Sequence, residues 1–199
     1  MKIGLYFGSF NPIHLGHLIV ANSMLETALL DEIWFVLSPQ SPFKTQSELA
    51  DEEDRKAMLE LAIKDNPKFK ISTIEFDLPK PSYTINTLKA LKKAHPEELF
   101  SIVMGADNLI NFHKWKAYEE IIELVNIQVY ARSTNAAIPP EWKTHEIVHI
   151  HPLPLINISS TFIRKKVANK ESIKYWVRKK VEQYILKNKL YRTLESEND

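Results

Sequence analysis

Two hydrophobic patterns alternate along the chain. Short runs of apolar and β-branched residues predict buried strands, and segments whose apolar residues recur every three or four positions predict helices. The expected strands are Lys2–Phe7, Glu32–Leu37, Lys70–Phe76, Leu99–Met104, Ile127–Ala131 and His145–His151. The expected helices are Leu15–Ala28, Asp51–Asp65, Thr84–Ala94, Leu109–His113, Ala117–Glu123, Ser160–Ala168 and Arg178–Asn188. This alternation predicts an α/β fold with a doubly wound parallel sheet.

The chain shows no internal repeat, no low-complexity stretch and no linker long enough to separate two domains. We therefore expect a single domain over residues 1–192, with a helical C-terminal portion at 159–192 and a tail at 193–199. Pro, Ser and Asn mark Ser38–Gln46 and Thr134–Trp142 as loops.

The first strand-to-helix junction carries two histidines, two glycines and a proline. Its sequence is Gly8-Ser9-Phe10-Asn11-Pro12-Ile13-His14-Leu15-Gly16-His17. In open α/β sheets such a junction binds phosphate, because the turn exposes backbone N–H groups and the helix N-terminus carries partial positive charge. Gly8 lets the backbone approach a ligand, and Gly16 lets the helix start pack closely. His14 and His17 project to the same side of the first helical turn.

Glycine is scarce, which limits how phosphate can be bound. The four glycines are Gly4, Gly8, Gly16 and Gly105. They form neither G-x-G-x-x-G nor G-x-x-x-x-G-K-[ST], the two commonest nucleotide-binding loops. Any phosphate site must therefore use the histidine-containing turn.

Composition places the chain among ordinary globular proteins. Its 199 residues suffice for a sizeable core, and 44% are hydrophobic and 26% charged. The lack of cysteine excludes disulfides and thiolate metal sites. No apolar run reaches membrane-spanning length, and the N-terminus lacks a signal-peptide pattern. We expect a cytoplasmic protein with no membrane partner.

The net charge of +1 conceals an uneven distribution. Residues 164–192 contain eleven Lys or Arg and two acids, whereas residues 48–60 contain six acids and two bases. The basic segment is typical of a solvated helical face, and its alternative role is to attract phosphate or nucleic acid. The solvated face is the simpler interpretation, and we expect no nucleic-acid partner.

Two motifs carry a resemblance to a known superfamily. Residues 8–17 fit G-x-F-x-P-x-H-x-G-H, and Ser159-Ser160-Thr161-Phe162-Ile163-Arg164 fits S-x-T-x-x-R. They resemble the two signatures of the HxGH nucleotidyltransferases, which are related to class I aminoacyl-tRNA synthetases. The resemblance implies a Rossmann-like fold of the nucleotidyltransferase type.

Further segments are similar to bacterial nicotinate-nucleotide adenylyltransferases, and the resemblance covers Met1 to Arg192. The segments are Arg55-Lys56-Ala57-Met58-Leu59-Glu60-Leu61-Ala62, Pro81-Ser82-Tyr83-Thr84-Ile85-Asn86-Thr87-Leu88, Met104-Gly105-Ala106-Asp107 with Trp115 downstream, and Val181-Glu182-Gln183-Tyr184-Ile185 with Leu190-Tyr191. The chain departs from that family in Arg132-Ser133-Thr134, where Arg-Pro-Gly is common, in a shorter loop after the second strand, and in Lys116, where an aromatic residue is common.

The resemblance implies adenylyl transfer from ATP to nicotinate mononucleotide. The products are nicotinate adenine dinucleotide (deamido-NAD) and pyrophosphate, and the pathway is NAD biosynthesis. The acceptor phosphate is an anion near neutral pH, so the reaction needs aligned polyanions rather than a general base. Mg²⁺ is the expected partner of ATP, held mainly by phosphates and water, and we expect no metal site built from protein ligands.

The resemblance also assigns residues on the ATP side. It implies His14, His17 and Arg164 as the catalytic residues: His17 donates to the α-phosphate, His14 holds neighbouring triphosphate oxygens, and Arg164 holds the β- and γ-phosphates. The remaining ATP-binding residues it implies are Gly8, Ser9, Phe10, Gly105, Asp107, Ser159 and Thr161. For Ser159 and Thr161 the alternative is helix capping alone.

On the acceptor side the resemblance implies Lys44, Thr84, Trp115 and Arg132. Trp115 would stack on the nicotinate ring, or pack in the core. Thr84 would donate to the nicotinate carboxylate; alternatively, Ser82 or Thr84 would only cap a helix. Lys44 would close over the phosphates or lie on the surface, and Arg132 would face a phosphate or form a salt bridge.

Three residues keep open roles. Arg55 approaches the phosphates or, more simply, forms a helix ion pair with an acid such as Glu52. His149 and His151 alternate on a predicted strand and share one face. Without an obvious third ligand, we favour a structural role for this pair over metal binding.

Two other functions remain possible on the sequence alone. One is another adenylyl- or cytidylyltransferase of the superfamily, with nicotinamide mononucleotide or pantetheine phosphate as acceptor. The other is a non-catalytic nucleotide- or nucleic-acid-binding protein that uses the basic C-terminal segment. The partners expected are ATP and nicotinate mononucleotide, and a homo-oligomer is possible.

Overall fold

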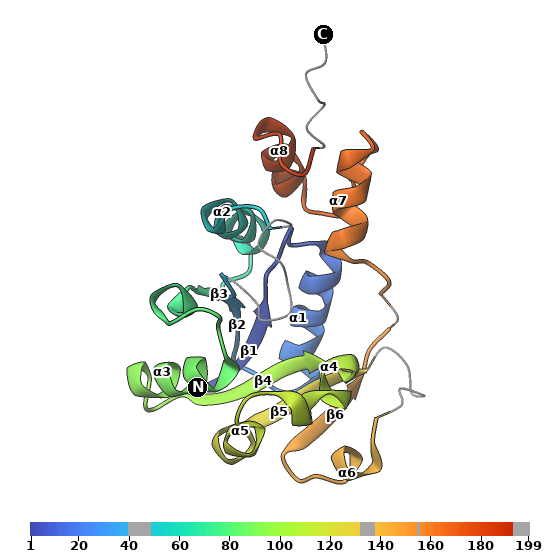
Figure 1. Cartoon of the computed structure of the whole chain (residues 1–199). Coiled ribbons are helices and arrows are strands. Elements are labelled where there is room, and N and C mark those ends of the chain that lie inside the picture. Colours follow the sequence, from blue (N-terminus) through green and yellow to red (C-terminus); the bar gives the residue numbers. More distant parts are fainter. Residues whose placement is uncertain (40–48, 132–137, 155, 193–199) are drawn as a thin grey trace.

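The computed structural model describes residues 1–39, 49–131, 138–154 and 156–192. Six parallel strands form one sheet in the order β3-β2-β1-β4-β5-β6 (Figure 1). The strands are β1 (Lys2–Gly8), β2 (Glu32–Leu37), β3 (Phe69–Ser72), β4 (Leu99–Gly105), β5 (Asn126–Ala131) and β6 (Val148–Pro152). The chain reverses its direction of travel across the sheet between β1 and β4, where open α/β sheets bind ligands. The predicted doubly wound parallel sheet is confirmed.

Helices cover both faces of the sheet. They are α1 (Leu15–Thr27), α2 (Glu52–Ile63), α3 (Thr84–Ala94), α4 (Ala106–Ile110), α5 (Tyr118–Leu124), α6 (Pro140–Lys143), α7 (Ser160–Ala168) and α8 (Lys179–Lys187). One hydrophobic core joins α1, α2, α7 and α8 to the sheet, and a second joins α3, α4, α5 and α6 to it. In the part of the chain that is described, no helix combines the length and apolarity needed to cross a membrane.

Most predicted strands and helices agree with those observed to within two residues, and three differ by more. The strand expected at Lys70–Phe76 stops at Ser72, because its sheet partner β2 ends one residue after the last pair, and a 3₁₀ helix, η2 (Ile74–Asp77), follows. The helix expected at Leu109–His113 begins earlier, as α4, and is followed by a second 3₁₀ helix, η3 (Phe112–Lys114). The strand expected from His145 begins at Val148, because a turn precedes it. The expected loop Thr134–Trp142 is wrong at its described end, where Pro140 begins the short helix α6.

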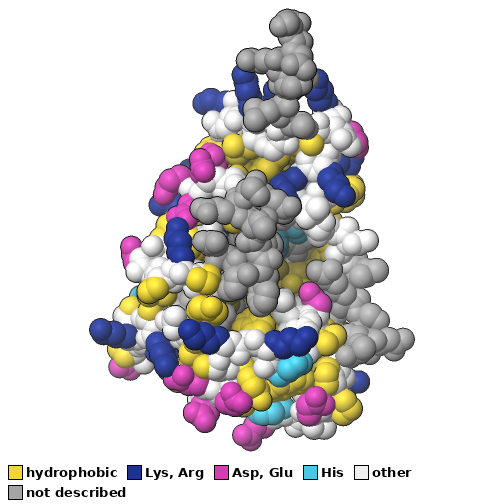
Figure 2. Space-filling model, in the orientation of Figure 1, with side chains coloured by type: hydrophobic (Ala, Val, Ile, Leu, Met, Phe, Trp, Pro, Cys, Tyr) yellow, Lys and Arg dark blue, Asp and Glu magenta, His cyan; other side chains and the backbone are white. Residues whose placement is uncertain are grey.

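The basic C-terminal segment forms α7, α8 and the chain around them. Val181 and Ile185 of α8 are buried, while Lys179, Lys180 and Lys187 are exposed. Figure 2 shows basic side chains gathered around the end of the molecule where Figure 1 places these helices. This is the pattern of a solvated helical face.

Candidate active site

The turn between β1 and α1 lies at the carboxyl end of the central strand β1. Phe10 has a left-handed backbone, with a φ of 42°, and its ring is buried. The ring packs edge-on against Tyr6, His17 and Phe35, with centroids 5.2–5.9 Å away. The core therefore holds the middle of the turn in a conformation that residues other than glycine rarely adopt.

His14 and His17 form a reciprocal cap at the start of α1. The backbone N–H of His17 donates to Nδ1 of His14, and that of His14 donates to Nδ1 of His17, both at 3.3 Å. The two rings stack with centroids 3.6 Å apart. The prediction that they share one side of the first helical turn is confirmed.

The two glycines of the turn make room for these rings. A Cβ atom on Gly8 would lie 2.9 Å from the Phe10 ring, and one on Gly16 would lie 3.0 Å from Nδ1 of His14. Neither glycine has a positive φ. Gly16 thus allows the start of α1 to pack closely against the His14 ring, and the close approach of a ligand at Gly8 stays a prediction.

Side chains of α7 donate hydrogen bonds to backbone carbonyls of the turn. Arg164 donates from a terminal guanidinium nitrogen to the carbonyl of Asn11 at 3.0 Å, and the hydroxyl of Ser160 donates to the carbonyl of Pro12 at 2.9 Å. Ser159 caps α7 by accepting from the N–H of Phe162 at 3.1 Å. The capping role of Ser159 is confirmed, and the role of Ser160 was missed because the motif leaves its position free.

Asn11 links the turn to two distant segments. Its side-chain oxygen accepts from the N–H of Ala50 at 3.0 Å and from the hydroxyl of Tyr191 at 2.8 Å. Burial raises the pKa of the Tyr191 hydroxyl above its ordinary value, so the group stays a donor. Sequence reasoning did not select Asn11 or Tyr191 for this role.

Two cavities meet at the turn. The first, between β1, α1 and α7, is lined by His14, His17, Ser159, Thr161 and Arg164 among others. The second, beside β4, is lined by His17, Gly105 and Trp115 among others. Tyr6, His17 and Tyr130 line both cavities, and the hydroxyls of the two tyrosines are 3.5 Å apart.

The cavities bring together most of the predicted ATP-side residues, together with Trp115. Trp115 is half-buried, packs edge-on against Phe112 at 5.3 Å and lines the second cavity. Asp107 is exposed in the first turn of α4, directly after Gly105 and Ala106. Thr84 is the first residue of α3.

Comparison with known proteins identifies the chain. A family model described as cytidylyltransferase-like matches residues 5–166. Curated relatives named probable nicotinate-nucleotide adenylyltransferases include those of Cytophaga hutchinsonii, 48% identical over 96% of this chain and 98% of the relative, and Flavobacterium psychrophilum, 46% identical over 96% of this chain and 100% of the relative. The chain belongs to the nicotinate-nucleotide adenylyltransferase family.

Solved structures agree on the fold. A Plasmodium falciparum nicotinic acid mononucleotide adenylyltransferase complexed with NaAD superposes with a TM-score of 0.81 over 96% of this chain and 97% of that chain, at 23% identity. A putative nicotinate-nucleotide adenylyltransferase from Vibrio parahaemolyticus gives a TM-score of 0.71 over 96% of this chain and 95% of that chain, at 22% identity. The nucleotidyltransferase fold inferred from the two motifs is therefore confirmed.

For this member of the nicotinate-nucleotide adenylyltransferase family, several sequence interpretations can now be revised. Arg55 makes no ion pair with Glu52, which instead pairs with Lys80 at 2.6 Å. The capping interpretation of Thr84 is wrong, because Tyr83 occupies the N-cap position of α3 and forms no side-chain cap. Lys44 and Arg132 lie outside the described residues.

The two strand histidines are placed on β6 beside β5. Nε2 of His151 lies 2.8 Å from the side-chain oxygen of Gln128, and burial lowers the pKa of the imidazole below its ordinary value. Among the described residues, no group of three or more His, Cys, Asp or Glu side chains is arranged to hold a metal ion. His151 thus has a protein partner, as the structural interpretation expected.

Proposed function

We propose that this protein transfers the adenylyl group of ATP to nicotinate mononucleotide in NAD biosynthesis. The observation that carries the proposal is the position of His17, which lines both cavities of the site. ATP and the acceptor nucleotide must meet at the α-phosphate of ATP. A hydrogen-bond donor on the wall that the two cavities share, such as His17, can reach that phosphate. Relatives at 46–48% identity over nearly the whole chain carry the name of this activity.

The reaction is a direct displacement at phosphorus. An oxygen of the mononucleotide 5′-phosphate attacks the α-phosphorus of ATP, and the bond to the bridging oxygen of the β-phosphate breaks. The products are deamido-NAD and pyrophosphate, which carries away the electron pair. Because the attacking phosphate is already an anion, the protein's task is alignment and stabilisation of charge.

The first cavity suits the triphosphate of ATP. It lies between the N-termini of α1 and α7, whose partial positive charges favour an anion. His14 and Arg164 contribute further hydrogen-bond donors at its wall, and Ser159 and Thr161 add hydroxyls. We place the β- and γ-phosphates near Arg164 and the α-phosphate near His17.

The second cavity suits the nicotinate nucleotide. Gly105, which the resemblance assigned to ATP, lines this cavity and not the first one, so we reassign it to the mononucleotide: it has no side chain, and a ligand can lie against the end of β4. Trp115 offers a ring at the same wall. Thr84, at the start of α3, is not among the residues that line this cavity, and we propose that it donates to the nicotinate carboxylate from beyond the cavity wall. A neutral donor there favours the acid over the amide, because the amide presents NH₂ where the carboxylate presents an acceptor.

Mg²⁺ is proposed to enter with ATP as part of the substrate. Phosphate oxygens and water satisfy its preference for octahedral oxygen coordination, so no dedicated set of protein ligands is required. We further propose that the protein acts in the cytoplasm and that ATP and the mononucleotide are its partners. Self-association stays a prediction that sedimentation velocity can test.

The deciding experiment measures pyrophosphate release from ATP and Mg²⁺ with nicotinate mononucleotide and nicotinamide mononucleotide side by side. Strong release with the acid alone is expected. Equal release with both acceptors would overturn the assignment of Thr84 as a selective carboxylate donor. If neither mononucleotide supports pyrophosphate release while pantetheine phosphate or a cytidylyl acceptor does, that compound would replace nicotinate mononucleotide as the proposed acceptor. Salt-sensitive nucleic-acid binding without any release would favour the non-catalytic alternative.

A further inference from the structure

Arg55 is a buried guanidinium whose described hydrogen bonds all end on backbone carbonyls. Its side chain projects from the first turn of α2, and the residue is 1% exposed. Nε donates to Ala50 at 3.0 Å, one terminal nitrogen donates to Ser9 at 3.0 Å and to Ser38 at 2.7 Å, and the other donates to Pro39 at 3.0 Å. Burial lowers its pKa below the ordinary value, but a guanidinium stays charged in a protein.

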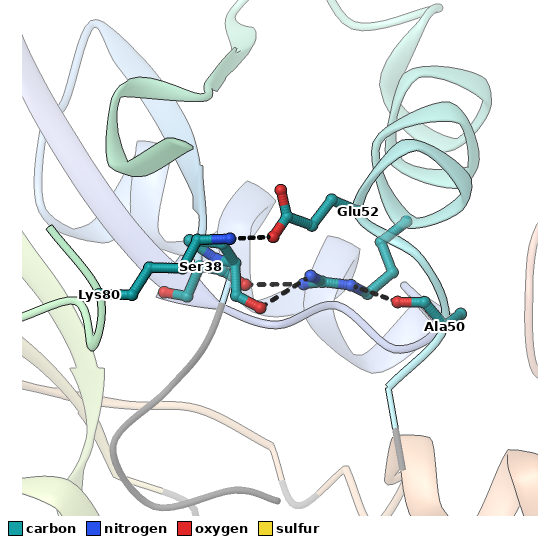
Figure 3. A network of polar contacts seen from close by, with 6 residues as sticks. Ser38, Ala50, Glu52 and Lys80 are labelled. Carbon is teal, nitrogen blue, oxygen red and sulfur yellow. Dashed lines mark hydrogen bonds and ion pairs between the residues drawn. The ribbon is translucent and has the colours of Figure 1, made fainter. Parts of the chain in front are cut away.

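These four carbonyls belong to three separate segments of the chain. Ser9 is in the turn that follows β1, Ser38 and Pro39 follow the end of β2, and Ala50 precedes α2. In Figure 3, Ser38 and Ala50 lie on opposite sides of the guanidinium, with the Glu52–Lys80 pair beside them. A planar group with five fixed donors can join carbonyls in this way, whereas the point charge of a lysine cannot.

The hydrogen bond from Arg55 to the Ser9 carbonyl constrains the backbone of the histidine-containing turn. Phe10 follows Ser9 with a left-handed backbone, a strained conformation that persists only when its surroundings enforce it. Arg55 holds the carbonyl before Phe10, and Arg164 holds the carbonyl of Asn11 after it. Two guanidinium groups from different helices therefore fix the backbone on either side of the strained residue.

Ala50 completes a second link between Arg55 and the turn. Its carbonyl accepts from Arg55, and its N–H donates to the side-chain oxygen of Asn11. Arg55 is thus connected to the turn directly through Ser9 and indirectly through Ala50 and Asn11. Replacing the guanidinium would remove both connections to the segment that carries Phe10.

We infer that Arg55 is a positioning residue for adenylyl transfer: by holding the Ser9 carbonyl and the ends of β2 and of the segment before α2, it sets the turn that presents His14 and His17. This inference rests on the proposed function. Arg55 itself touches neither cavity among the described lining residues, so it acts through the backbone. Misplacement of reacting groups by about 1 Å can cost about a hundredfold in rate.

The test compares Arg55→Lys with Met58→Ala, a control on the same helix. Met58 is fully buried in the hydrophobic core, and its truncation destabilises the protein without removing a donor from the carbonyls. Pyrophosphate release is measured with ATP and nicotinate mononucleotide well below each unfolding temperature, and kcat is expressed per folded molecule. We expect Arg55→Lys to lower kcat by about 10- to 100-fold, with a smaller change in the KM of ATP, and Met58→Ala to leave kcat within about twofold.

A second readout needs no substrate. Amide hydrogen exchange of the peptide spanning residues 8–14 is expected to be at least about tenfold faster in Arg55→Lys than in the wild type. In Met58→Ala it is expected to be unchanged, with both variants measured well below their unfolding temperatures. Because this measurement is independent of the acceptor, it decides the inference even if the wild type uses another acceptor and the proposed function fails.

Three outcomes overturn the inference. The first is wild-type kcat and wild-type exchange in folded Arg55→Lys. The second is an equal loss of kcat in Met58→Ala, which would make the effect one of general stability. The third is a failure of both Arg55→Lys and Arg55→Gln to fold, which would make Arg55 a residue of the fold alone.

Discussion

His14 and His17 stack their rings 3.6 Å apart, and Nδ1 of each accepts the backbone N–H of the other. A neutral imidazole that accepts at Nδ1 carries its proton at Nε2. The reciprocal cap thus selects the tautomer in which each ring carries its proton on Nε2. Two donors are arranged before any substrate binds, which is the condition for electrostatic stabilisation without reorganisation.

Replacing His17 by alanine should lower turnover by at least about a hundredfold, the scale for removing one preorganised donor to developing charge. The measurement is the rate of pyrophosphate release, with circular dichroism to show that the fold is kept. His149→Ala is the matched control, because His149 is exposed on β6 away from both cavities. Near-normal turnover in folded His17→Ala would remove this histidine from the mechanism.

Replacing Arg164 by lysine should lower kcat/KM for ATP by about tenfold or more. Lysine keeps the charge but loses the planar fork, and a hydrogen bond to a charged group is worth about 1.5–3 kcal/mol. Lys166→Met is the control, since Lys166 lies on the same helix and pairs with Glu171. If both variants weaken ATP equally, the effect comes from the overall positive field and not from the Arg164 fork.

Replacing Trp115 by alanine should raise the KM of nicotinate mononucleotide by about fivefold to tenfold, the scale of 1–1.4 kcal/mol for an aromatic contact. The KM of ATP should change little, because Trp115 lines only the cavity beside β4. Steady-state kinetics with each substrate varied in turn checks this. Trp115→Phe should recover part of the loss, and a change confined to ATP would contradict the stacking role.

Glu75 gives the protein a pH dependence of known sign. The carboxyl is buried and accepts from the hydroxyl of Thr87 at 2.8 Å. Burial raises its pKa above the ordinary 4.5, and the hydrogen bond from Thr87 offsets part of the rise. Below pH 4.5 the folded and unfolded chains both hold the proton; above it the unfolded chain loses the proton first, so stability falls as pH rises toward the raised pKa.

Glu75→Gln should therefore stabilise the protein at pH 8 and have little effect near pH 4.5. Each unit of pKa difference is worth about 1.4 kcal/mol. Thermal unfolding across this range checks the sign. Glu171→Gln is the opposite case, because a hydrogen bond from Lys166 lowers the pKa of Glu171. Its removal should cost stability in full above the ordinary pKa, and progressively less as pH falls through the lowered pKa. If the unfolding temperatures of the wild type and Glu75→Gln change in parallel with pH, the raised pKa of Glu75 is contradicted.

The sequence predicted best what depends on a regular pattern. The strand Glu32–Leu37 has the predicted bounds because it is, after Glu32, an unbroken apolar run largely buried on both faces, and the helices Thr84–Ala94 and Ser160–Ala168 have them because their apolar residues recur at helical spacing. The two motifs located the site because both lie at helix N-termini that the topology brings together. The helix that starts at Ala106 was placed too late, since nothing in its short sequence separates it from β4.

What the sequence could not supply are contacts between polar groups far apart in the chain. Arg55 looked like half of a helix ion pair, because an acid lay three residues before it, but Glu52 pairs with Lys80. The carbonyl partners of Arg55 carry no sequence signal, since every residue has a carbonyl. The bond from Tyr191 to Asn11 spans 180 positions, and no local spacing predicts it.

That last bond also has a consequence for how the protein is made. A ribosome synthesises Asn11 of the histidine-containing turn 180 residues before Tyr191, whose hydroxyl reaches the Asn11 side chain. While the last helix is still inside the exit tunnel, the turn lacks both this donor and the bonds from α7. The nascent chain thus emerges with its binding site unfinished, and the site closes only after Tyr191 has left the tunnel.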